Sequence, residues 1–177
     1  MQNAAAIRAA PICEYLPRRQ LLVGRLRITL GGMPSAPATL EDAIALAVEA
    51  HKGQRDRSGQ PYILHPLRVM FTCSTEIERI VAVLHDVVED TGRTFDDLRK
   101  LGFSEEVIAA LDCVTKRDGE NYEQFVERSA SNPVARRVKL ADLQDNMDVR
   151  RLSKLESRDL ERLAKYVKAW RRLTEPG

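Results

Sequence analysis

Four side chains that can hold a metal ion or transfer a proton lie within six residues of one another. They are His85, Asp86, Glu89 and Asp90, in the stretch Leu84-His-Asp-Val-Val-Glu-Asp90. At about 100° per residue, a helix would place His85 and Glu89 roughly 40° apart on one face. Asp86 and Asp90 are related in the same way. A divalent cation held by His85 and Asp86 would offset the cost of placing these charges beside an apolar stripe.

The residues before this stretch predict the helix that positions it. Apolar side chains recur at 77, 80, 81, 84, 87 and 88, the spacing of a helix with one buried face. We expect this helix to begin near Ile77 and to end near Thr91-Gly92. The alternative interpretation is a helix end whose acidic residues simply face water. Further candidate ligands elsewhere in the chain make this alternative weaker.

Two more side chains could complete a metal site. Pro66 is favourable in a first helical turn, so His65 should lie at the mouth of a helix covering residues 67–73. Asp142 lies on the apolar helix face of residues 138–148, where an unpaired carboxylate is costly. Either residue alone could be structural. A divalent ion needs several nitrogen and oxygen donors from different elements, and the candidate ligands are His65, His85, Asp86 and Asp142.

Helical patterns dominate the rest of the chain. Capping signals and apolar spacing predict helices at residues 39–52, directly after Thr94, and at 104–114, 121–129, 134–149 and 158–173. No segment alternates apolar and polar residues with a period of two. The sequence therefore predicts an all-α domain of seven or eight helices.

Composition limits the class of protein. The 177 residues allow one domain with a sizeable core, and no run of eighteen apolar residues could span a membrane. The net charge of +2 is uneven, since residues 1–40 hold five arginines and one glutamate (+4), which leaves −2 for the remainder. We expect no DNA or RNA partner. Cys13, Cys73 and Cys113 form no CxxC pair and fit a reducing cytoplasm.

The N-terminal segment differs in composition from the rest of the chain. Residues 1–38 are poor in acids and contain several arginines, which is typical of a transit peptide or of a disordered or extraneous extension. We favour the extension, with Met33 as a natural start. The functional domain is expected at residues 39–175.

Three motifs together resemble a known family. They are His51-Lys-Gly-Gln54 followed by Ser58-Gly-Gln-Pro-Tyr-Ile-Leu-His65-Pro66, then His85-Asp-Val-Val-Glu-Asp90, then Lys139-Leu-Ala-Asp142 with Asn146. The histidines and aspartates resemble the signature of HD-domain metal-dependent phosphohydrolases. The longer motifs are similar to the hydrolase half of RelA/SpoT alarmone enzymes, most of all to stand-alone small alarmone hydrolases. The resemblance covers about residues 39–170, and Glu89-Asp90 is its specific part.

The resemblance implies a helical HD domain that binds Mn²⁺ and removes the 3′-pyrophosphate from guanosine tetra- or pentaphosphate. It would make His65, His85, Asp86 and Asp142 the metal ligands. Glu89 and Asp90 would activate and orient the attacking water. The substrate-binding residues implied or compatible with it are Arg57, Ser58, Lys116 and Asn146.

Two departures from the family pattern leave the identity of the nucleotide base undecided. The guanosine-specific enzymes usually carry a basic residue at Asp56, and Asp142 is followed here by Leu143 rather than the common Arg. Hydrolysis is thus better supported than guanine specificity, and a (p)ppApp-type substrate stays open. A general HD nucleotidase or phosphodiesterase is the alternative, but it gives Glu89-Asp90 and the residue 58–62 loop no role. A catalytically dead binding module would normally lack a ligand. A homo-oligomer is possible.

Overall fold

The computed structural model describes residues 36–152, 154 and 156–175, all within one compact unit, Ser35–Gly177. Most of the expected N-terminal extension, with Cys13 and Met33, lies outside the described residues. Ala38 does not stand apart from the domain, because its N–H donates to the carbonyl of Gly102 (3.0 Å) and its side chain packs against the core.

Helices make up all the regular structure of the described residues, apart from one isolated bridge between Arg55 and Pro61. The helices are α1 (Leu40–Ala50), α2 (Leu64–Phe71), α3 (Glu76–Leu84), α4 (Val87–Asp90), α5 (Phe95–Lys100), α6 (Glu105–Val114), α7 (Tyr122–Ala130), α8 (Pro133–Asn146) and α9 (Ser157–Thr174), with a 3₁₀ turn, η1, at Val149–Arg151. The predicted all-α class is confirmed for the described residues. Among the described helices, none has the length and apolar character to cross a bilayer.

Local capping explains where most helices begin. Thr39, Thr75, Thr94 and Asn121 each accept an N–H from the third helical residue, whose side chain in turn accepts the cap's own N–H. Such reciprocal caps satisfy donors that a helix start leaves free. Asn132 caps α8, with Pro133 in its first turn. These signals are local, so the sequence could predict them.

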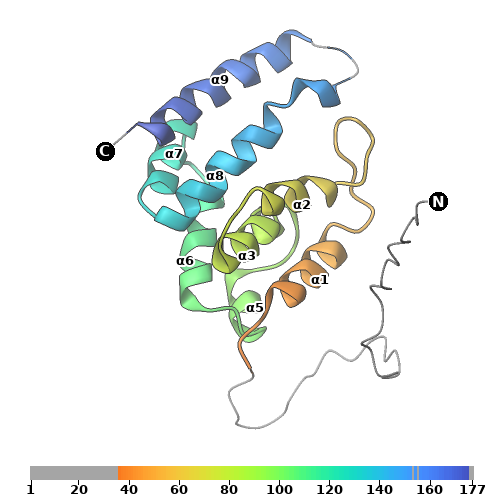
Figure 1. Cartoon of the computed structure of the whole chain (residues 1–177), viewed down its shortest axis with the longest axis vertical. Helices are drawn as coiled ribbons and strands as arrows, with labels where there is room; N and C mark the ends of the chain where they lie inside the picture. Colours follow the sequence, from red (N-terminus) through yellow and green to blue (C-terminus); the bar gives the residue numbers. More distant parts are fainter. Residues whose placement is uncertain (1–35, 153, 155, 176–177) are drawn as a thin grey trace, which may run out of the picture. The chain divides into compact units, whose positions relative to one another are not determined.

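Helix α3 lies at the centre of the fold (Figure 1) and contacts α1, α2, α6 and α8. Its residues Ile80 to Leu84 are all buried. The main core surrounds them with apolar side chains from α1, α2, α5, α6 and α8. A second, smaller core joins α7, α8 and α9 around Leu143 and Leu173. Helix α8 contributes to both cores and therefore connects the two halves of the domain.

The prediction of one helix from Ile77 to Thr91 is wrong in its middle. Helix α3 ends at Leu84, and α4 begins only at Val87. The imidazole Nδ1 of His85 lies 2.7 Å from the carbonyl of Ala82, and so occupies an oxygen at the end of α3. The backbone of His85 and Asp86 stays in the right-handed region, and Asp90 N–H still reaches the Asp86 carbonyl at 2.8 Å. The acidic residues therefore remain one turn beyond the break.

Candidate active site

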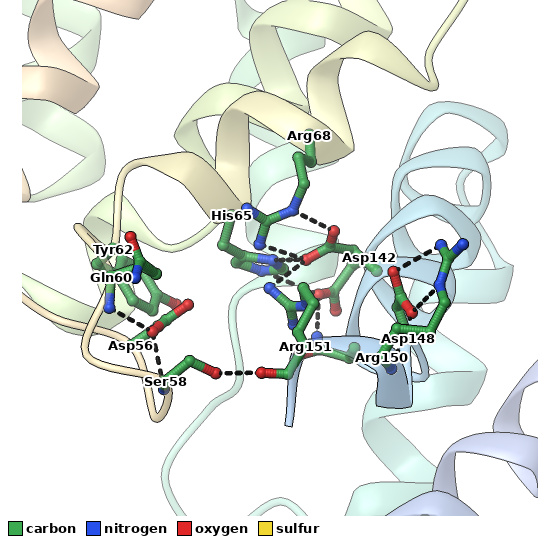
Figure 2. Close-up of polar contacts among 12 residues, drawn as sticks. Asp56, Ser58, Gln60, Tyr62, His65, Arg68, Asp142, Asp148, Arg150 and Arg151 are labelled. Atoms are coloured by element: carbon green, nitrogen blue, oxygen red, sulfur yellow. Dashed lines mark hydrogen bonds and ion pairs between the residues drawn. The ribbon is translucent and has the colours of Figure 1, made fainter. Parts of the chain in front are cut away.

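A cavity of about 460 Å³ holds the predicted site residues. Its floor comes from α2, the α3–α4 junction and α8, and its rim from the loop of residues 54–61, η1 and α9. Figure 2 shows Ser58 of this loop in contact with the backbone of Arg151, which belongs to η1. The floor and the rim differ in burial and in charge.

Three predicted metal ligands meet at the floor. Donor atoms of His65, His85 and Asp142 all lie within 4.8 Å of one another, and all three residues are buried. The His65 Nε2 lies 3.3 Å from Asp142 Oδ1, and the His85 Nε2 lies 3.8 Å from the same oxygen. Residues 65, 85 and 142 are far apart in the sequence, so only the packing of α2, α3 and α8 brings them together.

Asp86 joins this group from the side. Its Oδ2 lies 3.0 Å from His85 Nε2 and 3.6 Å from His65 Nε2. The same oxygen accepts a hydrogen bond from the Tyr62 hydroxyl (2.5 Å). Asp86 thus lies beside both histidines, while the donor atoms that all lie within 4.8 Å of one another belong to His65, His85 and Asp142. A divalent ion needs several such donors from different elements.

The orientation of His85 fits a metal. A carbonyl can only accept, so its contact with Ala82 places the proton on Nδ1 and leaves Nε2 with a free lone pair. Nε2 is fully buried, and its contact with Asp86 lacks hydrogen-bond geometry. Among the described residues it has no hydrogen-bond partner. A buried acceptor without a donor is costly, and a bound cation would satisfy it.

Burial and paired charges shift the pKa values of the floor residues. Burial alone would lower the pKa of His65, but hydrogen bonds and charges from Asp142 and Asp145 outweigh it and raise that pKa to about 9. Burial opposes ionisation of Asp86, yet the charge that His85 carries when its ring is protonated lowers the pKa of Asp86 to about 2. The pKa of Asp142 is likewise held well below its ordinary value, against burial, by Lys139 and the two histidines. Both carboxylates are therefore ionised at neutral pH.

Glu89 and Asp90 lie at the exposed edge of the floor. Both line the cavity from α4. Glu89 Oε2 accepts the backbone N–H of Lys116 at 2.9 Å, which connects α4 to the end of α6. Burial, followed by the charge of Asp86, raises the pKa of Asp90. Gln54 donates to the Asp90 carbonyl at 3.3 Å, so the loop of residues 54–61 also contacts this edge.

The predicted substrate residues divide between rim and floor. Arg57 and Lys116 line the rim of the cavity, and the Arg57 guanidinium pairs with Asp159 at 2.5 Å. Ser58 donates to the Arg151 carbonyl at 2.6 Å. Asn146 instead lies against the floor, where its amide donates to Asp142 Oδ1 at 2.5 Å. In this structure the Arg57, Ser58 and Asn146 side chains bond to protein groups.

Several residues of the site had no role in the sequence-based interpretation. Tyr62 was part of a motif, and its hydroxyl bonds to a predicted ligand. Asp145 lies three residues after Asp142 and contacts His65 Nδ1 at 2.7 Å. This spacing places Asp142 and Asp145 on one helix face, which is the only local signal for it. The others are Arg68, Arg151, Asp159, Arg162, Lys165 and Tyr166, all contacting or lining the site.

Curated proteins and solved structures both include proteins similar to this chain. No protein-family model matches the chain. It is 34% identical over 161 residues to a GTP pyrophosphokinase of Streptomyces coelicolor, covering 81% of this chain and 19% of that protein. It is 32% identical over 130 residues to the guanosine-3′,5′-bis(diphosphate) 3′-pyrophosphohydrolase of Aquifex aeolicus, covering 67% of this chain and 18% of that protein. The chain thus spans less than a fifth of these relatives.

A solved structure matches over a larger share of its length. It is a metazoan ortholog of SpoT that hydrolyses ppGpp, with a TM-score of 0.67 and 25% sequence identity, covering 81% of this chain and 89% of that one. The fold is therefore that of an HD-type hydrolase domain. The predicted resemblance to the RelA/SpoT hydrolase half is confirmed by the curated relatives and by this solved structure.

Proposed function

We propose that this chain is a metal-dependent hydrolase that removes the 3′-pyrophosphate of an alarmone nucleotide such as (p)ppGpp or (p)ppApp. The observation that carries the proposal is the buried convergence of His65, His85 and Asp142 at the floor of an open cavity. The names of the relatives, which include 3′-pyrophosphohydrolases, support the substrate class. The chemistry at this cavity would then be hydrolysis.

The donor set fits one divalent ion, and we propose Mn²⁺. His65 Nε2, His85 Nε2 and carboxylate oxygens of Asp86 and Asp142 would hold it, a mixture of imidazole and carboxylate that suits such metals. When bound, the ion lowers the pKa of a coordinated water and offsets phosphate charge. Lys139 donates to Asp142 at 2.8 Å and so fixes one carboxylate oxygen while the other faces the centre.

Glu89 and Asp90 are proposed to handle the proton of the attacking water. The Lys116 N–H holds one oxygen of the Glu89 carboxylate at 2.9 Å, which leaves the other oxygen available. A general base must lie within reach of the proton that it accepts, and α4 places both carboxylates at the edge of the proposed metal site. Burial and the charge of Asp86 raise the pKa of Asp90, so this carboxylate holds a proton more readily than an ordinary aspartate.

Basic side chains around the cavity would bind the phosphates. Lys116 reaches the rim from the end of α6, and Arg162 and Lys165 reach it from α9. A substrate with two pyrophosphate groups needs several such charges, because each ionised contact is worth about 1.5–3 kcal/mol. Arg57 and Ser58, in the loop of residues 54–61, are proposed to contact the base or the ribose of the nucleotide. Asn146 is proposed to contact the nucleotide near the metal.

A product assay tests the proposal. Purified protein with Mn²⁺ is given guanosine and adenosine 3′-pyrophosphates, nucleoside triphosphates and cyclic dinucleotides, and products are separated by anion exchange. Release of pyrophosphate from one or both 3′-pyrophosphates, with little turnover of the others, supports the proposal. Preferential cleavage of triphosphates or cyclic dinucleotides would contradict it and favour a general HD nucleotidase or phosphodiesterase.

A further inference from the structure

One carboxylate beside the proposed metal centre is outside the ligand set but contacts a ligand directly. Asp145 Oδ2 lies 2.7 Å from His65 Nδ1, while the other ring nitrogen, Nε2, faces Asp142 at 3.3 Å. An ionised carboxylate only accepts hydrogen bonds, so Nδ1 must keep its proton. The contact therefore reserves the Nε2 lone pair for the centre of the site.

Asp145 is itself held on two sides. The Arg68 guanidinium donates to both carboxylate oxygens, with Nε at 2.6 Å from Oδ1 and Nη2 at 3.1 Å from Oδ2. A second guanidinium, from Arg151, lies 3.2 Å from Oδ2. Figure 2 shows Arg68 and Arg151 in the same cluster of polar contacts as His65, and both arginines pair with Asp145. A two-point arginine contact fixes the plane of a carboxylate, so Asp145 presents a fixed acceptor to the ring.

The position of Asp145 argues against a ligand role. Its carboxylate meets His65 at Nδ1, whereas the other ring nitrogen, Nε2, faces the proposed ligands Asp142 and Asp86. Arg68 and Arg151 also offset its charge. Asp145 can therefore orient the imidazole without competing for the ion.

We propose that Asp145, held by Arg68 and Arg151, is a positioning residue that sets the ring orientation and tautomer of His65 for metal binding. The inference rests on the proposed metal-dependent function. The second imidazole ligand is oriented differently, since His85 Nδ1 bonds to the backbone carbonyl of Ala82. Only the His65 arrangement depends on a side chain, so it can be removed by substitution while that of His85 stays.

Metal affinity is the first test. Metal-free full-length protein is titrated with Mn²⁺ by calorimetry for the wild type, Asp145→Asn and Asp145→Leu. Loss of such an orienting partner typically weakens metal binding by about 10- to 100-fold. We expect Asp145→Asn at the lower end, since its amide oxygen can still accept from Nδ1, and Asp145→Leu at the upper end. Affinities within twofold of wild type in both variants would overturn the inference.

A matched control separates positioning from general destabilisation. Glu120 pairs with Arg128, and its side chain is 12% exposed, close to the 10% of Asp145. It is not among the residues that line the cavity. Glu120→Gln should bind Mn²⁺ as the wild type does, whatever its melting temperature. An equal loss of affinity in this control would also overturn the specific role of Asp145.

A spectroscopic readout tests the tautomer itself. The chain has three histidines, so long-range ¹H–¹⁵N correlations can be assigned on protein loaded with diamagnetic Zn²⁺. In the wild type, His65 and His85 should each carry a proton on Nδ1. Asp145→Leu should lose the protected Nδ1 proton of His65 but keep that of His85. Persistence of both signals would contradict the proposal.

The outcomes separate this inference from the proposed function. A wild-type protein that binds no Mn²⁺ or Zn²⁺ would contradict the metal centre, and with it both proposals. A wild type that binds the ion, with Asp145 variants that bind it equally well, would contradict only the positioning role.

Discussion

The floor and the rim of the cavity are built by different physical rules. At the floor, His65, His85 and Asp142 are buried and every charge faces an opposite charge or a hydrogen-bond donor. At the rim, Arg57 is half exposed and pairs with Asp159 across the opening. Buried charges need fixed partners because desolvation is costly, whereas exposed pairs contribute about 0–1 kcal/mol and can exchange partners. The floor therefore suits chemistry, and the rim suits recognition.

The largest effect is expected from removing a floor donor. His85→Ala or Asp142→Ala should abolish stoichiometric Mn²⁺ binding, because each removes a donor atom that no neighbour can replace. Elemental analysis after dialysis measures the bound metal, with Arg57→Ala as the rim control. One tightly held Mn²⁺ per chain in either floor variant would contradict the ligand assignment.

The next effect separates metal binding from proton transfer. Glu89→Gln keeps the side-chain volume and the acceptor for the Lys116 N–H, but it removes the base. Turnover should fall by about 10²- to 10⁴-fold, the range for losing a positioned general base, or roughly 3–5 kcal/mol of barrier. Mn²⁺ content and substrate KM should stay near wild type.

Either of two results would contradict the role proposed for Glu89. Loss of metal in Glu89→Gln would make Glu89 a ligand. Unchanged turnover would place the base elsewhere and favour the general nucleotidase.

The floor should also make the metal-free protein sensitive to alkaline pH. The pKa of His65 is raised from 6.5 to about 9 in the folded state, so its proton stabilises the fold. This contribution is fully present below pH 6.5 and is lost as the pH rises through 9. The melting temperature of metal-free protein should therefore fall by several degrees between these values.

Saturating Mn²⁺ offers the control for this pH dependence. The bound ion would take the place of the proton between His65 and Asp142, so the alkaline decline should disappear. Scanning calorimetry from pH 6 to 9.5, with and without Mn²⁺, measures both curves. Parallel curves would show that His65 does not contribute to the metal site.

The smallest effect is expected at the rim. Arg57→Ala should cost less than about 1 kcal/mol of stability, because the Arg57–Asp159 pair is partly exposed. It should leave Mn²⁺ affinity unchanged and raise the substrate KM by up to about tenfold, the equivalent of 1.4 kcal/mol. Arg150→Ala, which removes an exposed arginine paired with Asp148, is the matched control. Equal KM values in both variants would exclude Arg57 from substrate contact.

Most of the fold could be predicted because its signals are local. The start of α1 at Leu40 follows from the Thr39–Asp42 capping box, and the start of α8 from Asn132 and Pro133. The observed α9, Ser157–Thr174, differs by one residue at each end from the predicted 158–173. The break after Leu84 could not be predicted, because it accompanies a contact between the His85 ring and one carbonyl.

The sequence by itself determined where the helices begin, which faces are apolar and which residue types could hold a metal, because caps and periodicity act over a few residues. The tertiary structure decided which atoms meet. Approach of α2 to α8 places the carboxylate of Asp145 against His65, and neither spacing nor composition encodes that contact directly. The ring nitrogen that faces the centre depends on these neighbours, since an imidazole presents the nitrogen whose proton no partner holds.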